Sequence, residues 1–237
     1  MKAKTIVVCG DSFCTAENNT ATNERHHFSQ ILEDTYGYEV INLAHGGVST
    51  VGICFQVQKA FNDNDLMPDV IIHGWTDPER IEVPLSDMTF DPNMGLQNFA
   101  YPFKLQSGYN SQYTGSPNAP FFSGQLIDLA SPDTVLSDFP VLSNARKQAV
   151  KMYINFLYDA NLKSTIDNWL YEYWSMKILQ KNIILIPFKP VGLANIAYDF
   201  SYRTNGRYPK CYHTDHATQQ ELSKRMHHEI LNQLAQK

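Results

Sequence analysis

Short apolar runs alternate with amphipathic stretches along this chain. Four runs rich in Val and Ile are bounded by polar or turn residues, a pattern typical of strands buried in a parallel sheet. The predicted strands cover residues 5–9, 39–43, 69–73 and 182–187. Most of the remaining apolar residues recur at the three- and four-residue spacing of helices. The predicted helices cover residues 28–36, 51–61, 144–157 and 164–180.

The C-terminal segment carries the clearest helical pattern. Residues 218–221, Thr-Gln-Gln-Glu, form a capping-box sequence, which predicts that a helix starts there. One apolar stripe follows at four-residue spacing: Leu222, Met226, Ile230 and Leu234. We therefore expect His216 in the loop just before this helix, where the packed helix holds it without burying it. A similar packing argument places the aromatic residues of the preceding predicted helix in the core. They are Trp169, Tyr171, Tyr173 and Trp174.

The alternation of strands and helices predicts an α/β fold. We expect a three-layer α/β/α sandwich with a mainly parallel, flavodoxin-like sheet and right-handed crossovers. A chain of 237 residues with 43% hydrophobic residues can bury one substantial core, so residues 1–237 are expected to form a single domain. Ligands of such sheets bind at the carboxyl ends of the strands. Ser12, Gly47 and Thr76 each follow such an end.

Residues 81–140 differ in amino-acid composition from the rest of the chain and are predicted to form a long insertion after the third strand. Seven of the twelve prolines fall between Pro84 and Pro140, interleaved with aromatic residues, so little regular structure is expected. The insertion also holds six acidic residues and one basic residue. Its many aromatics argue against disorder, and we expect an ordered cap or a partner-binding surface.

Charge and composition exclude several classes of protein. The formal charge of −5 argues against a general nucleic-acid binder. No apolar stretch approaches the ~20 residues that cross a bilayer, and the N-terminus lacks a signal-peptide core. We therefore expect no membrane partner and a location in the cytoplasm or in a virion-like particle. The four cysteines lack metal-ligand spacing and disulfide density, so reduced thiols are expected and no metal or other cofactor is predicted.

The segment Ile6–Ser12 carries the first candidate for chemistry. It predicts an apolar strand that delivers Ser12 into a sharp turn, where the hydroxyl can act as a nucleophile. Gly-Asp-Ser is also an ordinary turn sequence, so this segment is informative only together with others. Three further segments follow it along the chain: residues 40–49, 69–77 and 213–216.

In order and context these four segments resemble the sequence blocks of the SGNH (GDSL-type) hydrolases. The resemblance covers residues 4–80 and 182–235 and implies a serine ester hydrolase. It implies that Ser12 is the nucleophile and His216 the general base, and that the amides of Ser12 and Gly47 are oxyanion-hole donors.

The chain departs from the family pattern at two positions. Thr76 stands where the family has an asparagine, and its hydroxyl is the expected oxyanion donor. His213 stands where the family has the aspartate of the catalytic triad. We therefore expect a Ser–His dyad, with Asp215 as the candidate third member. Alternatively, Asp215 is simply a residue that favours the start of the helix.

Three more residues are candidate substrate contacts: Asp11, Trp75 and Arg80. Arg80 either pairs with Glu79 or Glu82 at the surface or clamps an anionic group of the substrate. The expected activity is removal of a small acyl group such as acetyl, from a glycan or another small-molecule ester, as in carbohydrate esterases. A homo-oligomer is left open.

Three alternatives compete with this hypothesis. The chain could be a non-catalytic SGNH-like binding or assembly protein, in a particle such as a virion, with residues 81–140 as its working surface. Metal binding by histidines is weakly supported, because no carboxylate or cysteine completes a site. The histidine pairs are 213 with 216, 26 with 27, and 227 with 228. Phosphoryl transfer on Asp11 is disfavoured by the absence of a second aspartate and of a glycine-rich phosphate loop.

Overall fold

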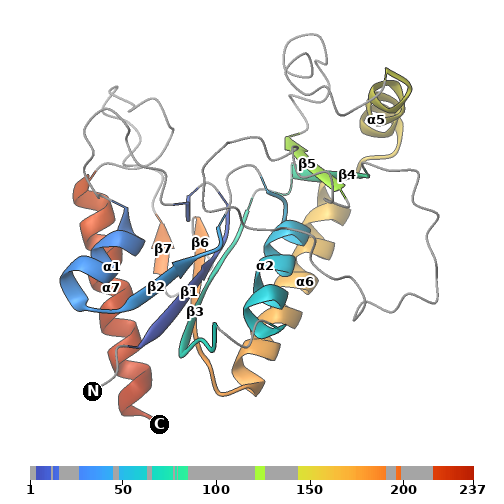
Figure 1. Ribbon diagram of the computed structural model, residues 1–237. Helices are drawn as coiled ribbons and strands as arrows, with labels where there is room; N and C mark the ends of the chain where they lie inside the picture. Colours follow the sequence, from blue (N-terminus) through green and yellow to red (C-terminus); the bar gives the residue numbers. More distant parts are fainter. Residues whose placement is uncertain are drawn as a thin grey trace.

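A parallel sheet with helices on both faces forms the centre of the computed structural model (Figure 1). The structure describes residues 4–11, 13–15, 27–44, 48–62, 66–76, 78, 80–84, 121–125, 144–190, 196–198 and 216–237. Within these residues the strands of the sheet are β1 (Thr5–Cys9), β2 (Glu39–Asn42), β3 (Val70–Gly74), β6 (Ile184–Pro190) and β7 (Ile196–Tyr198). Their order is β2-β1-β3-β6-β7, and each neighbouring pair is parallel.

Helices lie on both sides of this sheet. They are α1 (Phe28–Tyr36), α2 (Thr50–Asn62), α6 (Ala160–Gln180) and α7 (His216–Ala235), and a further helix, α5 (Asn144–Phe156), lies away from the sheet. Figure 1 shows α1 and α7 on one side of the sheet and α2 and α6 on the other. The four predicted strands and the predicted helices are therefore confirmed, with boundaries that shift by a few residues. The mixed α/β class with a parallel sheet is confirmed with them.

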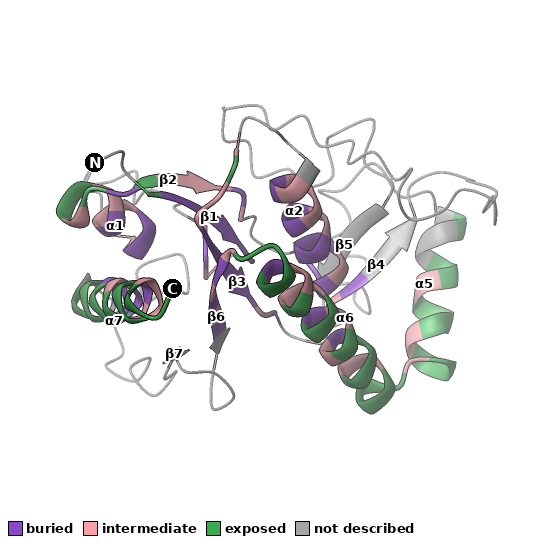
Figure 2. Ribbon diagram, turned by 90° about the horizontal axis from the view of Figure 1, so that it is seen from below, coloured by how far each residue is buried: buried purple, intermediate pink, exposed green. Residues whose placement is uncertain are grey.

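Alternate residues of each strand fill two separate cores. Side chains of successive strand residues point to opposite faces of a sheet. Ile6 and Val8 accordingly join a cluster under α1 and α7, whereas Val7 and Cys9 join a cluster under α2 and α6. All five residues of β1 are buried, as Figure 2 also shows. This double burial explains why the strands read as continuous apolar runs.

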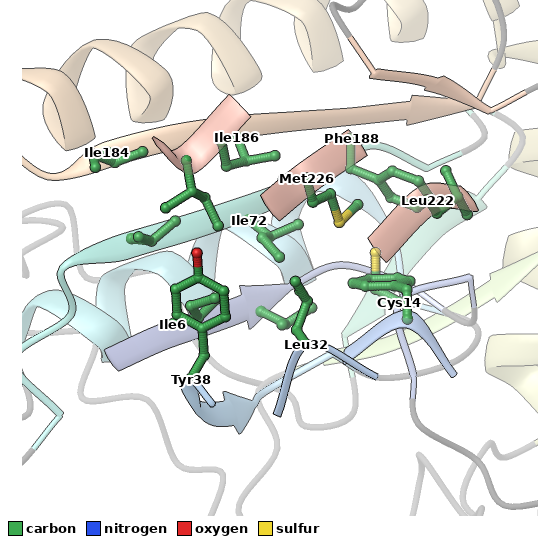
Figure 3. Packing of buried hydrophobic residues seen from close by; sticks show 14 residues of the cluster. Ile6, Cys14, Leu32, Tyr38, Ile72, Ile184, Ile186, Phe188, Leu222 and Met226 are labelled. Carbon is green, nitrogen blue, oxygen red and sulfur yellow. The ribbon is translucent and has the colours of Figure 1, made fainter. Parts of the chain in front are cut away.

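The predicted stripe of α7 is confirmed. Leu222, Met226 and Ile230 are buried against β1, β3 and β6, and Leu234 packs at the edge of the same cluster (Figure 3). Burying one aliphatic side chain of this size stabilises a fold by about 1.5–3 kcal/mol. The stripe is therefore a main reason why α7 lies on the sheet.

The start of α7 corrects the sequence interpretation. The helix begins at His216, so His216 is its first residue and does not lie in a loop ahead of it. The residue before it in the sequence, Asp215, is as favourable before a helix as threonine is. The capping-box pattern at 218–221 therefore falls inside the first turns and does not mark the boundary.

The aromatic residues of α6 divide between two environments. Tyr171 is buried and Trp174 packs against the cluster under α2 and α6, as predicted. The prediction is wrong for Trp169 and Tyr173, which are 65% and 48% exposed. Aromatic side chains recur on both faces of this helix, and only one face meets the sheet.

Two strands lie in the predicted insertion. β4 (Arg80–Pro84) and β5 (Phe121–Gln125) pair antiparallel, with Arg80 opposite Gln125 and Pro84 opposite Phe121. The alternation Arg-Ile-Glu-Val at the start of β4 is a strand signal that sequence reasoning overlooked, and Ile81 is buried as that alternation implies. The rest of the insertion, residues 85–120 and 126–140, lies outside the described residues.

Within the described part of the chain, no helix combines the length and the apolar character needed to cross a bilayer.

Two glycines bring β1 and β3 unusually close at their carboxyl ends. A Cβ atom on Gly74 would lie 2.8 Å from the Cα of Gly10 and 2.9 Å from the carbonyl oxygen of Cys9. Both neighbours are backbone atoms, which cannot move aside as a flexible side chain can. The ends of β1 and β3 therefore touch at this edge only because Gly74 has no side chain.

We predict that Gly74→Ala lowers the free energy of unfolding by about 1–3 kcal/mol, because the added methyl group must push two strands apart. Urea unfolding followed by circular dichroism measures the loss. Leu231→Ala, at a half-exposed position of α7, is the control and should change stability by less than about 0.5 kcal/mol. Equal stability of Gly74→Ala and the unmodified protein would contradict the close approach.

Candidate functional site

The candidate site lies at the carboxyl edge of the sheet, between β1 and β3. The strand order runs from β1 to β2 in one direction and from β1 through β3 to β6 in the other. The first two connections therefore pass over opposite faces, α1 on one side and α2 on the other. Such a reversal opens a crevice outside the strand ends, where ligands of α/β proteins bind. Asp11 follows β1 and Thr76 follows β3 at this edge.

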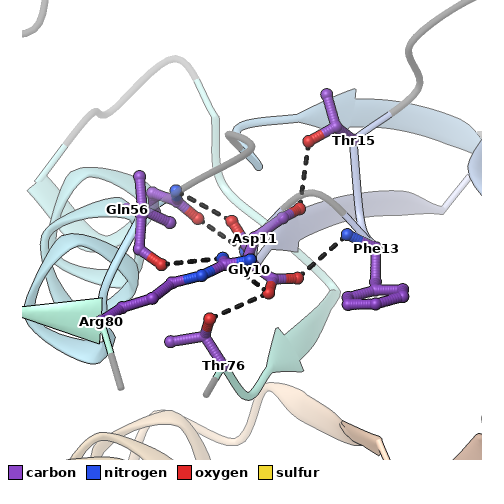
Figure 4. A network of polar contacts seen from close by, with 8 residues as sticks. Gly10, Asp11, Phe13, Thr15, Gln56, Thr76 and Arg80 are labelled. Atoms are coloured by element: carbon purple, nitrogen blue, oxygen red, sulfur yellow. Dashed lines mark hydrogen bonds and ion pairs between the residues drawn. The ribbon is translucent and has the colours of Figure 1, made fainter. Parts of the chain in front are cut away.

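The carboxylate of Asp11 is the centre of the site (Figure 4). Asp11 is only 1% exposed. Its Oδ2 atom accepts hydrogen bonds from the Thr76 hydroxyl and from Arg80 Nη1, each at 2.9 Å. Its Oδ1 atom accepts the backbone N–H of Phe13 at 3.0 Å. A buried carboxylate needs such donors, and here they come from three separate segments of the chain.

The backbone around Asp11 is also fixed on both sides. The carbonyl oxygen of Asp11 accepts the N–H of Cys14 at 2.9 Å and the hydroxyl of Thr15 at 3.0 Å. Gln56, buried in α2, accepts the Gly10 N–H at 2.6 Å and donates its amide N–H to the Gly10 carbonyl at 3.1 Å. The residues on either side of Ser12 in the sequence are therefore held in a defined turn.

A histidine holds the far side of this turn. His27 precedes α1, and its Nδ1 atom accepts the N–H of Ser29 at 3.3 Å. The ring proton is therefore on Nε2, which donates to the carbonyl of Phe13 at 3.1 Å. His27 thus ties the start of α1 to the turn after β1. Sequence reasoning considered this residue only as a weak metal ligand.

Arg80 connects three segments at the site. Besides Asp11, its Nη1 atom contacts the carbonyl oxygen of Val48 at 3.2 Å, just before α2. Its side chain is 13% exposed, and that of Asp11 is 2% exposed, so the ion pair is largely removed from water. Breaking one partner of such a pair is costly because it leaves the other charge uncompensated. Sequence reasoning proposed nearby glutamates as partners and missed Asp11, which is 69 positions away.

Thr76 is fully buried beneath the turn. A hydroxyl group has one hydrogen, and that of Thr76 is donated to Asp11. The structure therefore shows Thr76 as a support of Asp11. Its role as an oxyanion donor stays a prediction, and it would require this hydrogen bond to open.

Aromatic side chains pack together at this edge of the sheet, on the side of α6. Tyr171 stacks on His73 at 4.2 Å between ring centres and meets the edge of Trp75 at 5.3 Å. His73 Nδ1 lies 3.2 Å from the hydroxyl of Ser175, and the backbone N–H of Trp75 donates to the carbonyl of Phe188 at 2.8 Å. Trp75 is half-buried, so its contact with substrate stays a prediction.

Cys14 lies beside the site but is a poor nucleophile. It is fully buried, and this burial is the main cause that raises the pKa of its thiol well above the ordinary value; the nearby Asp11 charge adds to the shift. A thiol with a raised pKa stays protonated and unreactive at neutral pH. Cys9 and Cys54 are also buried.

The first turns of α7 pack beside the turn after β1. Gln219 accepts the backbone N–H of Phe28 at 2.8 Å, and Leu222 belongs to the same buried cluster as Cys14, with Phe13 at its edge (Figure 3). His216 begins this helix. The structure therefore brings the helix that carries His216 to the segment that carries Ser12. The positions of Ser12, Gly47 and Asp215, and the side chain of His216, lie outside the described residues.

Among the described residues no group of three or more His, Cys, Asp or Glu side chains could hold a metal ion. His227 is engaged elsewhere, stacked on Tyr36 at 4.0 Å and bonded through Nδ1 to the Tyr38 hydroxyl at 2.9 Å. His213 and the side chain of His216 lie outside the described residues.

Comparison with known proteins finds no family model that matches the chain and no curated protein that matches it in sequence. The functional argument therefore depends on the motifs and on the geometry of the site.

We predict that Asp11→Asn lowers the free energy of unfolding by about 3 kcal/mol, because Arg80 then lacks a charged partner in a buried site. Asp69→Asn is a matched control, since Asp69 pairs with Lys4 at the surface and should cost less than about 1 kcal/mol. Urea unfolding measures both values. Similar losses for the two variants would show that the Asp11 network does not stabilise the fold.

Proposed function

We propose that this protein is a serine esterase of the SGNH type. In this proposal the chain is a single domain with a three-layer α/β/α sandwich, a flavodoxin-like sheet and an inserted segment at about 81–140. Its substrate is a small acyl ester, such as an acetyl ester on a carbohydrate. The proposal is supported by the fixed turn after β1 at the switch point of the sheet, where Asp11 and Phe13 are the sequence neighbours of Ser12, and by the packing of α7, which begins with His216, beside this turn.

The proposed reaction follows the acyl-enzyme route. Ser12 Oγ attacks the ester carbonyl carbon while His216 accepts the hydroxyl proton. The carbonyl oxygen becomes negative in the tetrahedral intermediate and is stabilised by the amides of Ser12 and Gly47. His216 then protonates the departing alcohol, and a water molecule hydrolyses the acyl-enzyme by the same steps. Asp215 remains the candidate that orients His216.

Asp11 acts in this proposal as a positioning residue. Its two oxygens accept hydrogen bonds from Thr76, Arg80 and Phe13, so it is suited to holding the turn and poorly placed to exchange protons. A nucleophile held in one geometry before the substrate arrives saves the entropy of arranging it. The network around Asp11 therefore supports catalysis by keeping residues 10–15 rigid.

The charge of the site favours an uncharged substrate. Asp11 compensates the positive charge of Arg80, so the pair presents little net charge at this edge of the sheet. An anionic substrate would have to compete with Asp11 for Arg80. Neutral acyl esters of sugars or other small alcohols carry no such requirement.

One observation favours the second hypothesis, a non-catalytic binding protein of the same fold. The hydroxyl of Thr76, which replaces the expected asparagine, is already used by Asp11. Losing one oxyanion donor typically costs on the order of 100- to 1,000-fold in rate. Direct measurement of the nucleophile separates the two hypotheses.

We predict that a fluorophosphonate probe labels the purified protein at Ser12 alone, as located by peptide mass spectrometry. Reaction requires an activated hydroxyl and no knowledge of the substrate. Ser12→Ala should abolish labelling, and its unchanged circular dichroism spectrum would show that the fold is intact. A folded protein that takes up no probe would refute the esterase proposal and favour the binding protein.

We also predict that His216→Ala reduces the rate of probe labelling and of p-nitrophenyl acetate hydrolysis by about 1,000-fold, because the general base is removed. Alanine suits a helix, so α7 should persist. His228→Ala is the matched control, since His228 is an exposed histidine on the same helix. A rate unaffected by His216→Ala would exclude the Ser–His mechanism.

A further inference from the structure

The outer face of α6 exposes several large apolar side chains. Its exposed large hydrophobic residues are Leu162, Ile166, Trp169, Tyr173, Met176 and Leu179. The opposite face already packs against α2 and β6 through Tyr171, Trp174 and Ile178. We refer to the six exposed residues as the α6 stripe. No described segment covers it, and exposed positions run along the helix in Figure 2.

The other long helix of the protein shows that this pattern is not general. The solvent side of α7 carries mainly polar residues, and Leu231, at 47%, is the one exposed large hydrophobic residue there. The two helices are similar in length and both pack on the sheet. Only α6 is apolar on the side that faces away from the sheet.

The spacing of the α6 stripe is that of a helix pair. Leu162, Ile166, Trp169, Tyr173 and Met176 follow one another at alternating intervals of four and three residues. This alternation places apolar side chains on one seam, as at the core positions of two-stranded helical assemblies. Contact with solvent alone does not require apolar residues at this spacing.

The exposed area is close to what an interface needs. Taking about 200 Å² for a fully exposed large side chain, the six exposed fractions correspond to roughly 600 Å² on one helix. Monomers rarely present larger apolar patches. A stable interface buries about 800 Å² per partner, so the α6 stripe supplies most of one side.

The charges that flank the α6 stripe identify the partner as a second copy of this chain. In a parallel pair, each flanking residue on one edge of the seam faces the residue five positions later on the partner. Glu172 is such a residue, and the position five later is Lys177. A two-fold axis therefore forms this opposite-charge contact twice. In an antiparallel pair Glu172 does not face Lys177, so this contact is lost.

We propose that the protein forms a two-fold symmetric dimer through the α6 stripe, with the two α6 helices parallel and Glu172 of each chain beside Lys177 of the other. The dimer is independent of the proposed esterase activity, because Asp11 and Thr76, which mark the candidate site, do not belong to the α6 stripe. Trp169 and Tyr173 sit at the centre of the seam. They are the residues expected to contribute most to binding.

Sedimentation velocity over a range of protein concentrations tests this dimer. The unmodified protein should sediment as a dimer, and Trp169→Glu should raise the dissociation constant by about 100-fold or more. Because Trp169 is mostly exposed in the monomer, the circular dichroism spectrum should be unchanged, which would show that the monomer still folds. Leu231→Glu is the matched control on α7 and should leave the dimer intact.

Charge reversal tests the partner and the orientation. Glu172→Lys and Lys177→Glu should each weaken the dimer about tenfold, because each variant faces like charges twice. The double variant should restore it. A monomeric unmodified protein, a dimer that survives Trp169→Glu, or single reversals without effect would each overturn the proposal. A monomer would mean that another segment of this chain or a different protein covers the stripe.

Discussion

The buried carboxylate of Asp11 is the interaction on which the candidate site depends. A charged group with 1% exposure is tolerated only when donors surround it, and Thr76, Arg80 and Phe13 provide them. Each donor belongs to a different part of the chain: the end of β3, the start of β4 and the turn after β1 itself. The hydrogen bonds to this one carboxylate therefore align these three segments. The hydrogen bonds that stabilise the Asp11 carboxylate therefore also position the residues on either side of Ser12 in the sequence.

The packed sheet holds the strand ends that carry this polar network. Its strands are buried on both faces, so the apolar cores under α1 and α7 and under α2 and α6 hold the strand ends in register without help from the polar network. Gly10 and Gly74 then allow β1 and β3 to leave the sheet almost in contact. The short side chain of Thr76 reaches Asp11 because the two strand ends are so close.

Local patterns predicted the fold well, and distant contacts explain what they missed. The apolar runs and the α7 stripe are local signals, so the strands and the buried face of α7 could be predicted from neighbouring residues. The partners of Gly10 and Asp11 could not, because Gln56 is 46 and Arg80 is 69 positions away. The start of α7 was misplaced because Asp215 and Thr218 are both acceptable before a helix. Trp169 was misplaced because an apolar residue pattern does not say whether its burial is within one chain or between chains.

The contact between Arg80 and Asp11 has a consequence for how the protein can change over evolution. Arg80 is the first residue of β4, so it stands at the start of the segment 81–140 and outside the five-stranded sheet. A change of sequence beyond β4 that leaves Arg80 in place therefore keeps both groups of the ion pair with Asp11. In the proposed function, the chain thus separates a fixed centre around Asp11 from an inserted segment whose sequence can vary, and the side chain of Arg80 marks the border between them.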